Sequence, residues 1–373
     1  MQDSPTSNPE EQPGAAAEAP TEAPCEAPAA EPPAPTNVVP ADEEAIARAA
    51  ELLRGGGVVA FPTETVYGLG ADALNETAVA RVFRIKGRPL DHPVIVHLAG
   101  GAALADWARD VPPAAHALAE AFWPGPLTLI LKRAPEVPDA VTGGQDTVGL
   151  RVPEHPVAQA LLEAFGRDDG ASRPRGLAAP SANKFGHVSP TTAAHVRADL
   201  GDEVDLVLDG GAAEFGIEST IVDLSGEQPA ILRPGAISAE AIARVLGASP
   251  QAPDAQTTRA PGTRPAHYAP RAKVRLVRRV ELLEALASRR GQRFGVLALE
   301  VTVPRLAAGL QRVCPAIATR YAHELYANLR ALDAQNVSQI LVEAPPRSAA
   351  WSAINERLVR AARGGEQGLE DAA

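Results

Sequence analysis

Short apolar runs alternate with amphipathic stretches over most of this 373-residue chain, a pattern that predicts an α/β fold. Asp42 is a favourable N-terminal cap, Glu43 and Glu44 suit a first helical turn, and the glycines that begin at Gly55 would end the helix. We therefore expect a helix that starts beside Asp42. The apolar residues at 58–61 predict a buried strand directly after it.

The next helix is expected from about Glu76, and it would carry Lys86 and Arg88 at its C-terminal end. An expected strand at 94–98 ends near His97. Further strand-like runs lie at 127–131, 148–152, 177–179, 206–208 and 221–224, and helical stretches lie near 113–122, 156–165, 191–199 and 238–246. Because helices separate only some of these strands, the order predicts a mixed, twisted sheet rather than a regular βαβ series.

Periodicity is lost in a segment rich in Pro, Ala, Thr and Gln, and we assign residues 247–272 to a linker. After it, strands are expected at 273–277, 294–299 and 339–342, and helices at 281–289, 321–332 and 351–362. This alternation predicts a smaller, Rossmann-like, parallel α/β domain of three layers over residues 273–363. The larger, catalytic domain would then occupy residues 40–246.

Both ends of the chain have a composition typical of disorder. Residues 1–39 are rich in Ala and Pro and hold seven of the eleven excess negative charges without a single Lys or Arg, and residues 364–373 are similarly polar. The rest of the chain is only mildly acidic, which argues against a broad nucleic-acid-binding face.

Cysteine content and hydropathy narrow the class of protein further. Cys25 and Cys314 cannot form a disulfide framework and lack the spacing of metal ligands, which favours a reducing cytoplasm. No apolar run is long enough to span a membrane, and the N-terminus has no basic start or apolar core of a signal peptide.

Two short polar motifs are the strongest candidates for chemistry. Lys86-Gly87-Arg88 places two cations near a helix end, and Ser181-Ala182-Asn183 places a hydroxyl and an amide after a strand. Together they would form a phosphate cradle in which the cations neutralise oxygens and the small polar groups fix their positions. Neither a G-x-G-x-x-G nor a Walker-type loop is present, so the nucleotide site would be unconventional.

Ten motifs in one order make the chain resemble the threonylcarbamoyl-AMP synthases, in their two-domain form with a YrdC-like catalytic domain. The motifs are FPTETVYG at 61–68, KGRP at 86–89, PVIVH at 93–97, FWPGPLT at 122–128, DTVGLRVP at 146–153, APSAN at 179–183, SPT at 189–191, GIEST at 216–220, LRPG at 232–235 and HYAP at 267–270.

The resemblance implies that L-threonine, bicarbonate and ATP are converted to threonylcarbamoyl-AMP, pyrophosphate and water. A tRNA threonylcarbamoyl transferase would be the functional partner, ATP would be a substrate, and Mg²⁺ would be bound through its phosphates. The sequence identifies no metal ligand. The residues that the resemblance places at the catalytic centre are Lys86, Arg88, Ser181 and Asn183. Those it assigns to ATP are the same four together with Thr147, Arg233 and Tyr268, and those it assigns to threonine are Thr63, His97, Arg151, Ala179 and Ser219.

Each assignment has a structural alternative. Cations at a helix end can simply complement the dipole, and Ser181 and Asn183 can belong to an ordinary turn. His97 can be a hydrogen-bonded histidine at a strand end. Arg151, in an apolar strand, needs either a substrate carboxylate or an internal ion pair.

His267 and Tyr268 lie in an otherwise featureless linker. A structureless tether needs neither residue, and long loops in compact proteins often act as lids. We therefore expect the linker to fold over the active site, with Tyr268 near the nucleotide.

Two other functions are considered. In an RNA-binding module the same cations would grip a phosphodiester backbone without nucleotide turnover, but basic and aromatic residues are not interleaved as such a surface requires. An ATP-using carbamoyl-transfer module of another pathway would add zinc-finger segments, which two cysteines cannot form.

Overall fold

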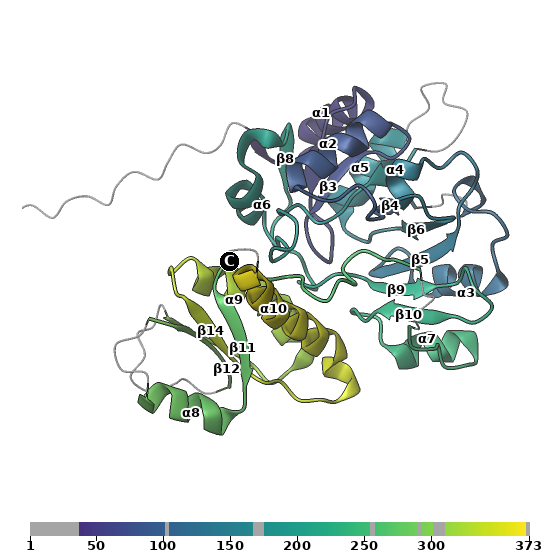
Figure 1. Ribbon diagram of the computed structural model, residues 1–373. Coiled ribbons are helices and arrows are strands. Elements are labelled where there is room, and N and C mark those ends of the chain that lie inside the picture. The colour runs from purple at the N-terminus through teal and green to yellow at the C-terminus, as the bar shows by residue number, and fades with distance from the viewer. Residues whose placement is uncertain are drawn as a thin grey trace, which may run out of the picture. The chain divides into compact units, whose positions relative to one another are not determined.

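A computed structural model describes residues 37–100, 104–166, 175–253, 258–288, 293–300 and 310–370 (Figure 1). These residues form a 10-stranded sheet and a 4-stranded sheet that belong to one compact unit. In chain order, the elements of the larger sheet and its helices are β1 (Val38–Pro40), α1 (Glu43–Arg54), β2 (Val59–Phe61), β3 (Gly68–Asp72), α2 (Glu76–Lys86), β4 (Ile95–His97), η1 (Leu104–Asp106), α3 (Pro113–Phe122), β5 (Leu127–Lys132), α4 (Asp139–Thr142), β6 (Thr147–Arg151), α5 (Pro156–Gly166), β7 (Leu177–Ala178), α6 (Ala193–Leu200), η2 (Gly201–Glu203), β8 (Leu206–Asp209), β9 (Thr220–Asp223), β10 (Ala230–Arg233) and α7 (Ala239–Leu246).

The larger sheet mixes parallel and antiparallel pairs, which confirms the predicted mixed sheet. Its strand order is β1-β8-β2-β3-β7-β4-β6-β5-β9-β10. The β2–β8, β4–β6 and β5–β9 pairs are parallel, whereas β3 is antiparallel to both β2 and β7.

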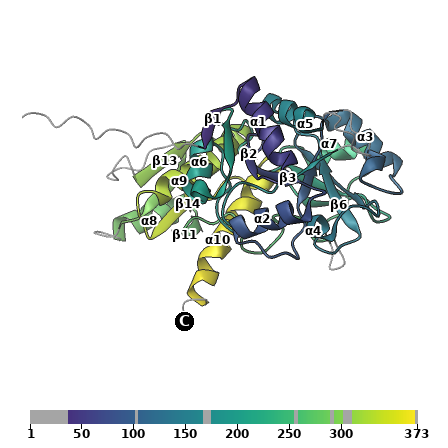
Figure 2. The same ribbon diagram turned by 90° about the horizontal axis from the view of Figure 1, so that it is seen from above.

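Alternate side chains of β2 supply the cores on the two faces of this sheet. Val59 and Phe61 pack with α1 and α5, which lie side by side (Figure 2). Ala60 packs with α2 and α6 on the opposite face. The sheet is therefore covered on both faces, and its strand ends are left to form a site.

Local signals at both ends of α2 explain where this helix stops. Asn75 caps its N-terminus, because its side chain accepts the Ala78 N–H at 3.1 Å. Gly87 follows its last residue with φ 65°, in the left-handed conformation that ends many helices, and its N–H bonds to the carbonyls of Phe83 and Arg84. The helix ends at this glycine, so Lys86 is the last residue of α2 and Arg88 lies outside the helix.

The smaller sheet is wholly parallel in the order β11-β14-β12-β13, which confirms the Rossmann-like arrangement. Ile340 and Val342 of β14 pack toward α9 and α10, and Leu341 packs toward α8, so three layers result (Figure 1). Its elements are β11 (Lys273–Val277), α8 (Arg279–Ser288), β12 (Gly295–Leu299), β13 (Gln311–Cys314), α9 (Ala318–Asp333), β14 (Gln339–Glu343), η4 (Ala349–Trp351) and α10 (Ser352–Glu370).

Four strands of the structure were not predicted from the sequence: β1, β3, β10 and β13. β3 contains Gly68 and Gly70, which are poor strand formers. Most of the predicted tail at 1–39 lies outside the described residues, but Val38 and Val39 belong to β1. At the other end of the chain, α10 continues to Glu370, within the segment 364–373 that was expected to be a tail.

None of the helices in the described ranges combines the length and apolarity that crossing a bilayer would require.

Substitution of Gly87 tests whether its left-handed conformation ends α2. We expect Gly87→Ala to lower the free energy of unfolding by about 1 kcal/mol, because a Cβ disfavours this conformation. Gly87→Asn should cost less, since Asn tolerates this conformation better than Ala. Urea denaturation followed by circular dichroism measures both. Equal stability of Gly87→Ala and the wild type would contradict this account of the helix end.

Candidate functional site

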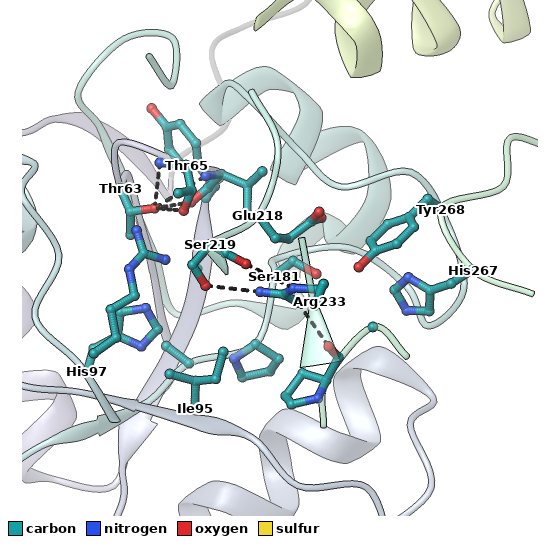
Figure 3. Close-up of a pocket in the computed structure, with 18 of the residues that line it drawn as sticks. Thr63, Thr65, Ile95, His97, Ser181, Glu218, Ser219, Arg233, His267 and Tyr268 are labelled. Atoms are coloured by element: carbon teal, nitrogen blue, oxygen red, sulfur yellow. Dashed lines mark hydrogen bonds between the residues drawn. The ribbon is translucent and has the colours of Figure 1, made fainter. Parts of the chain in front are cut away.

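A cavity of about 50 Å³ lies where loops from the larger sheet meet the segment that leads to the smaller sheet (Figure 3). Charged and hydroxyl-bearing side chains predominate among the predicted site residues that line it. Nine of the predicted site residues do so: Thr63, Arg88, His97, Arg151, Ala179, Ser181, Ser219, Arg233 and Tyr268. Side chains far apart in the sequence therefore meet in one place, as the phosphate-cradle interpretation requires.

The loop between β2 and β3 is folded by its own threonines. The Thr63 hydroxyl donates to the carbonyl of Val66 at 2.6 Å and accepts the N–H groups of Thr65 and Val66. The hydroxyls of Thr63 and Thr65 also lie 2.8 Å apart. This local hydrogen bonding, a known habit of Ser and Thr side chains, turns both hydroxyls toward the cavity (Figure 3).

Two buried arginines are held mainly by carbonyls and rings. Arg88 donates to the carbonyl of Pro93 at 2.7 Å, and its guanidinium lies 5.7 Å from the ring of Phe185. Arg233 donates to the Ser219 carbonyl and hydroxyl, both at 3.0 Å, and to the Pro261 carbonyl at 2.9 Å. Burial lowers the pKa of Arg88 to about 10, so this guanidinium remains a cation at neutral pH. Burial also lowers the pKa of Arg233. The two arginines give the cavity a charge suited to anions.

Arg151, the third arginine at the cavity, forms an internal ion pair, which is one of the two arrangements expected from the sequence. Arg151, at the end of β6, donates to Glu64 at 2.7 Å, and both side chains are almost wholly buried. The Arg151 Nε has no hydrogen-bond partner, so the ion pair leaves a donor unused. The internal pair and a substrate contact are therefore compatible.

His97 is a neutral imidazole beside these cations. Burial, with a contribution from Arg151, lowers the pKa of His97 to about 3. Its Nδ1 is buried without a hydrogen-bond partner, and its ring lies edge-on to Phe61 at 6.1 Å. Buried polar atoms rarely lack partners, so an open nitrogen at a cavity wall points to a ligand.

Three predicted site residues do not line the cavity. Lys86 is buried behind it and donates to the carbonyls of Ser181 and Asn183, the latter at 2.6 Å. Asn183 donates to the carbonyls of Lys184 and His187. Burial first and Arg88 second lower the pKa of Lys86 well below its usual value. Lys86 therefore fixes the loop that carries Ser181, a role that its position in the sequence could not reveal.

Thr147 is the third of these residues. It begins β6 opposite Lys132 and lies away from the cavity wall.

Residues 258–272 form the covering segment, which leads to the smaller sheet and contributes Pro261, Gly262, His267 and Tyr268 to the cavity wall. His267 and Tyr268 are buried, their rings lie 4.1 Å apart, and both residues line the cavity (Figure 3). Burial lowers the pKa of His267 to about 3 and raises the pKa of Tyr268 to about 12, so both side chains are neutral. Tyr268 holds φ 60°, a conformation unfavourable for any residue but glycine, which indicates that surrounding contacts fix it.

Ten further residues that line the cavity were not predicted as site residues, among them Thr65 and Glu218. Both belong to recognised motifs, FPTETVYG and GIEST, but the sequence does not indicate which members face inward.

The carboxylate at the cavity wall is already satisfied by protein groups. Glu218 accepts hydrogen bonds from Ser189, Tyr326 and Arg357, and these contacts occupy both of its oxygens. The described residues contain no cluster of three or more His, Cys, Asp or Glu side chains placed to hold a metal ion.

Comparison with known proteins gives consistent matches to one family. Residues 51–235 match the family model described as telomere recombination (Sua5, YciO and YrdC), and residues 237–363 match that of the threonylcarbamoyl-AMP synthase C-terminal domain. The threonylcarbamoyl-AMP synthase of Bacillus subtilis is 39% identical over 340 residues, covering 88% of this chain and 96% of the relative. The Pyrococcus abyssi enzyme of the same name is 44% identical over 269 residues, covering 69% of this chain and 77% of that protein.

A solved structure extends the similarity to both sheets. The crystal structure of P. abyssi Sua5 complexed with L-threonine matches with a TM-score of 0.78 and 37% identity, and the match covers 88% of this chain and 97% of that one. The sequence and the fold agree over nearly the whole length of these relatives, and the chain belongs to the two-domain threonylcarbamoyl-AMP synthase family.

Proposed function

We propose that this protein forms threonylcarbamoyl-AMP from L-threonine, bicarbonate and ATP, with release of pyrophosphate and water. The observation that carries the proposal is the meeting of three buried arginines, Arg88, Arg151 and Arg233, around one hydroxyl-lined cavity. The substrates are anions, and a family relative is known in complex with L-threonine.

Threonine would occupy the part of the cavity near β4 and β6. The unused donor of Arg151 would bind the threonine carboxylate, and Glu64 would hold that arginine in place. The remaining threonine contacts would come from Thr63, His97, Ala179 and Ser219.

ATP would lie on the side of Arg88, Arg233 and Tyr268, with Ser181 bonding a phosphate oxygen. Lys86 and Asn183 would act through the loop that they hold. Thr147 remains a predicted ATP contact, made beyond the cavity. Mg²⁺ would arrive with the ATP phosphates and screen their charge, because magnesium commonly binds phosphates and keeps part of its water shell.

The chemistry requires positioning more than acid–base groups. The threonine nitrogen and bicarbonate give a carbamate with loss of water, and a carbamate oxygen then attacks the α-phosphorus of ATP. The bond from that phosphorus to the bridging oxygen breaks, and pyrophosphate leaves. The arginines would hold the anions in line and stabilise the negative charge that develops on the phosphate oxygens.

The covering segment would open to admit ATP. The cavity of about 50 Å³ is far below the roughly 300–1,000 Å³ typical of sites for larger ligands. A closed segment over the finished mixed anhydride would exclude water and prevent its hydrolysis. The product would then pass to a tRNA threonylcarbamoyl transferase, which we propose as the functional partner.

A direct assay tests the reaction. We expect the protein, given ATP, L-threonine and bicarbonate, to form pyrophosphate and an adenylate with the mass of threonylcarbamoyl-AMP. Ser181→Ala should lower the rate about 100-fold or more, by analogy with loss of one oxyanion donor. Lys86→Ala should also lower the rate, because the loop that carries Ser181 loses the two hydrogen bonds that fix it. Arg278→Ala, at an exposed position on the smaller sheet, is the matched control. Absence of the adenylate, or equal turnover of other amino acids, would contradict the proposal.

The buried ion pair gives a stability prediction. Glu64→Leu should lower the free energy of unfolding by about 3 kcal/mol, because it leaves Arg151 buried and uncompensated. The double variant Glu64→Leu/Arg151→Leu should recover most of this loss in urea denaturation but fail to bind threonine in calorimetry. A double variant that binds threonine normally would remove Arg151 from the proposed site.

Gly262 tests the covering segment. It has φ 79°, and an added Cβ would overlap the Tyr268 hydroxyl. We expect Gly262→Ala to raise the KM for ATP about ten-fold, which corresponds to about 1.4 kcal/mol of lost binding. Gly226→Ala, where an added Cβ meets no atom within 4 Å, is the control. An unchanged KM in Gly262→Ala would contradict the proposed lid.

A further inference from the structure

Two helices of the smaller sheet reach the back wall of the cavity. Tyr326 of α9 donates its hydroxyl to Glu218 at 2.9 Å, and Arg357 of α10 donates its Nε to the same carboxylate oxygen at 2.8 Å. Ser189, from the larger sheet, donates to the other oxygen at 2.5 Å. Burial alone would raise the pKa of Glu218, but Arg357 and Arg233 lower it to about 2, so the wall carries a fixed, compensated anion.

The same two side chains hold the tyrosine of the covering segment. The ring of Tyr326 stacks on Tyr268 at 5.8 Å with an angle of 24°, and the Arg357 guanidinium lies 5.1 Å from the Tyr268 ring. An arginine over an aromatic face is attractive, more so away from water, and the Arg357 side chain is fully buried. These contacts can offset the unfavourable backbone conformation of Tyr268.

The backbone of the covering segment is also tied to α10. The His267 N–H donates to the Arg360 carbonyl at 3.4 Å, and the Arg360 guanidinium donates to the Arg264 carbonyl. Both of these bonds lie on the N-terminal side of Tyr268, and both come from one residue of α10.

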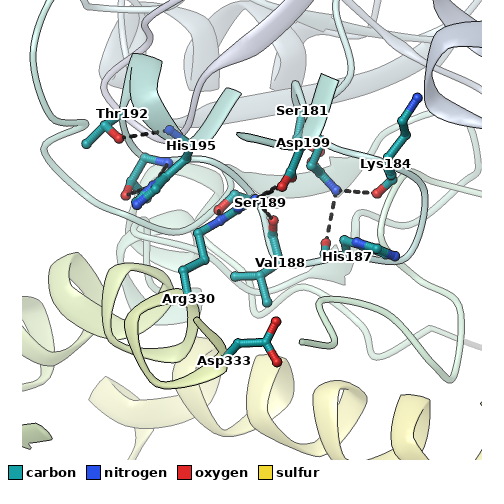
Figure 4. A network of polar contacts seen from close by, with 12 residues as sticks. Ser181, Lys184, His187, Val188, Ser189, Thr192, His195, Asp199, Arg330 and Asp333 are labelled. Carbon is teal, nitrogen blue, oxygen red and sulfur yellow. Dashed lines mark hydrogen bonds and ion pairs between the residues drawn. The ribbon is translucent and has the colours of Figure 1, made fainter. Parts of the chain in front are cut away.

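A second ion pair between the same two parts of the chain provides a contrast. Arg330 of α9 pairs with Asp199 and donates to the carbonyls of Val188 and Ser189 (Figure 4). It contacts neither Glu218 nor Tyr268, and it does not line the cavity. Arg330 therefore connects α9 with the larger domain through Asp199, which does not line the cavity. Arg357 instead connects α10 with the larger domain through Glu218, which does line it.

We infer that Arg357 and Tyr326 are positioning residues, through which the smaller sheet sets the affinity of the site for ATP. Arg357 compensates the charge of Glu218 and holds Tyr268 over the cavity, and Tyr326 of α9 donates a hydrogen bond to Glu218 and stacks on Tyr268. If Arg357 is lost, Glu218 loses the cation that donates to it, at a wall that the ATP phosphates approach, and the Tyr268 ring loses one of its contacts. The inference rests on the proposed function, because the affected ligand is ATP.

Kinetics of the full-length protein test this inference. We expect Arg357→Met to raise the KM for ATP about ten-fold or more, with a smaller change in the threonine dissociation constant measured without nucleotide. Arg357→Met/Glu218→Gln should recover part of the ATP affinity, since the negative charge at the wall is gone. A merely structural role would lower the amount of active enzyme and hence kcat, and would leave the KM for ATP unchanged.

The control is Arg330→Met, which breaks the other ion pair and should alter the KM for ATP much less than Arg357→Met. If Arg357→Met does not fold, Tyr326→Phe decides, because it removes only the hydroxyl bond to Glu218 and should still raise the KM for ATP. An unchanged KM in the folded Arg357→Met protein, or in Tyr326→Phe where that variant decides, would overturn the inference. A wild-type protein that makes no adenylate would instead refute the proposed function.

Discussion

Burial of positive charge is the constraint on which this structure depends. Arg88, Arg151 and Arg233 surround a single cavity, and a buried cation is costly unless its donors are satisfied or it faces an anion. Each arginine meets this requirement differently: Arg88 uses a carbonyl and aromatic rings, Arg151 uses Glu64, and Arg233 uses Ser219 and Pro261. The larger sheet holds the three cations in place before any ligand arrives, which is what an electrostatic catalyst requires.

The smaller sheet is part of this arrangement rather than an appendage. Glu218 stands at the cavity wall, but two of its three partners, Tyr326 and Arg357, come from α9 and α10. Tyr268 covers the cavity from a segment that carries no regular secondary structure, and its ring is held by the same two side chains. A few contacts with neighbouring parts of the chain therefore decide the position of this segment, among them the hydrogen bonds of His267 with Arg360 and of Ala269 with Gly186.

Local signals predicted most of the elements. The Asp42 cap and the 3.6-residue periodicity that follows gave α1 correctly, and the apolar run after Gly57 gave β2. The strands that were missed have identifiable reasons. β3 contains Gly68 and Gly70, which are poor strand formers, yet antiparallel neighbours on both sides hold it in the sheet. β1 and β10 are short: β1 has three residues and pairs with the distant β8, and β10 has four residues and pairs with the preceding strand β9.

The candidate site was predictable as a set of motifs but not as a geometry. Nine residues that the motifs predicted do line the cavity. Lys86 instead donates to backbone carbonyls, and its position at a helix end does not specify the direction of its side chain. The contacts of Glu218 with Tyr326 and Arg357 join residues more than 100 positions apart, and only tertiary packing sets such pairs. The sequence left open whether Arg151 binds a substrate carboxylate or forms an internal ion pair. Its observed geometry allows both, because Arg151 pairs with Glu64 and its Nε has no partner.

The central claim is that one cavity holds both the amino acid and the nucleotide. A crystal structure of the protein with L-threonine and a non-hydrolysable ATP analogue tests it most directly. The account predicts the threonine carboxylate about 3 Å from the Arg151 guanidinium and the phosphates at similar distance from Arg88 and Ser181, with Tyr268 above them. Ligands bound on a different face, or a nucleotide that contacts none of the three arginines, would contradict it.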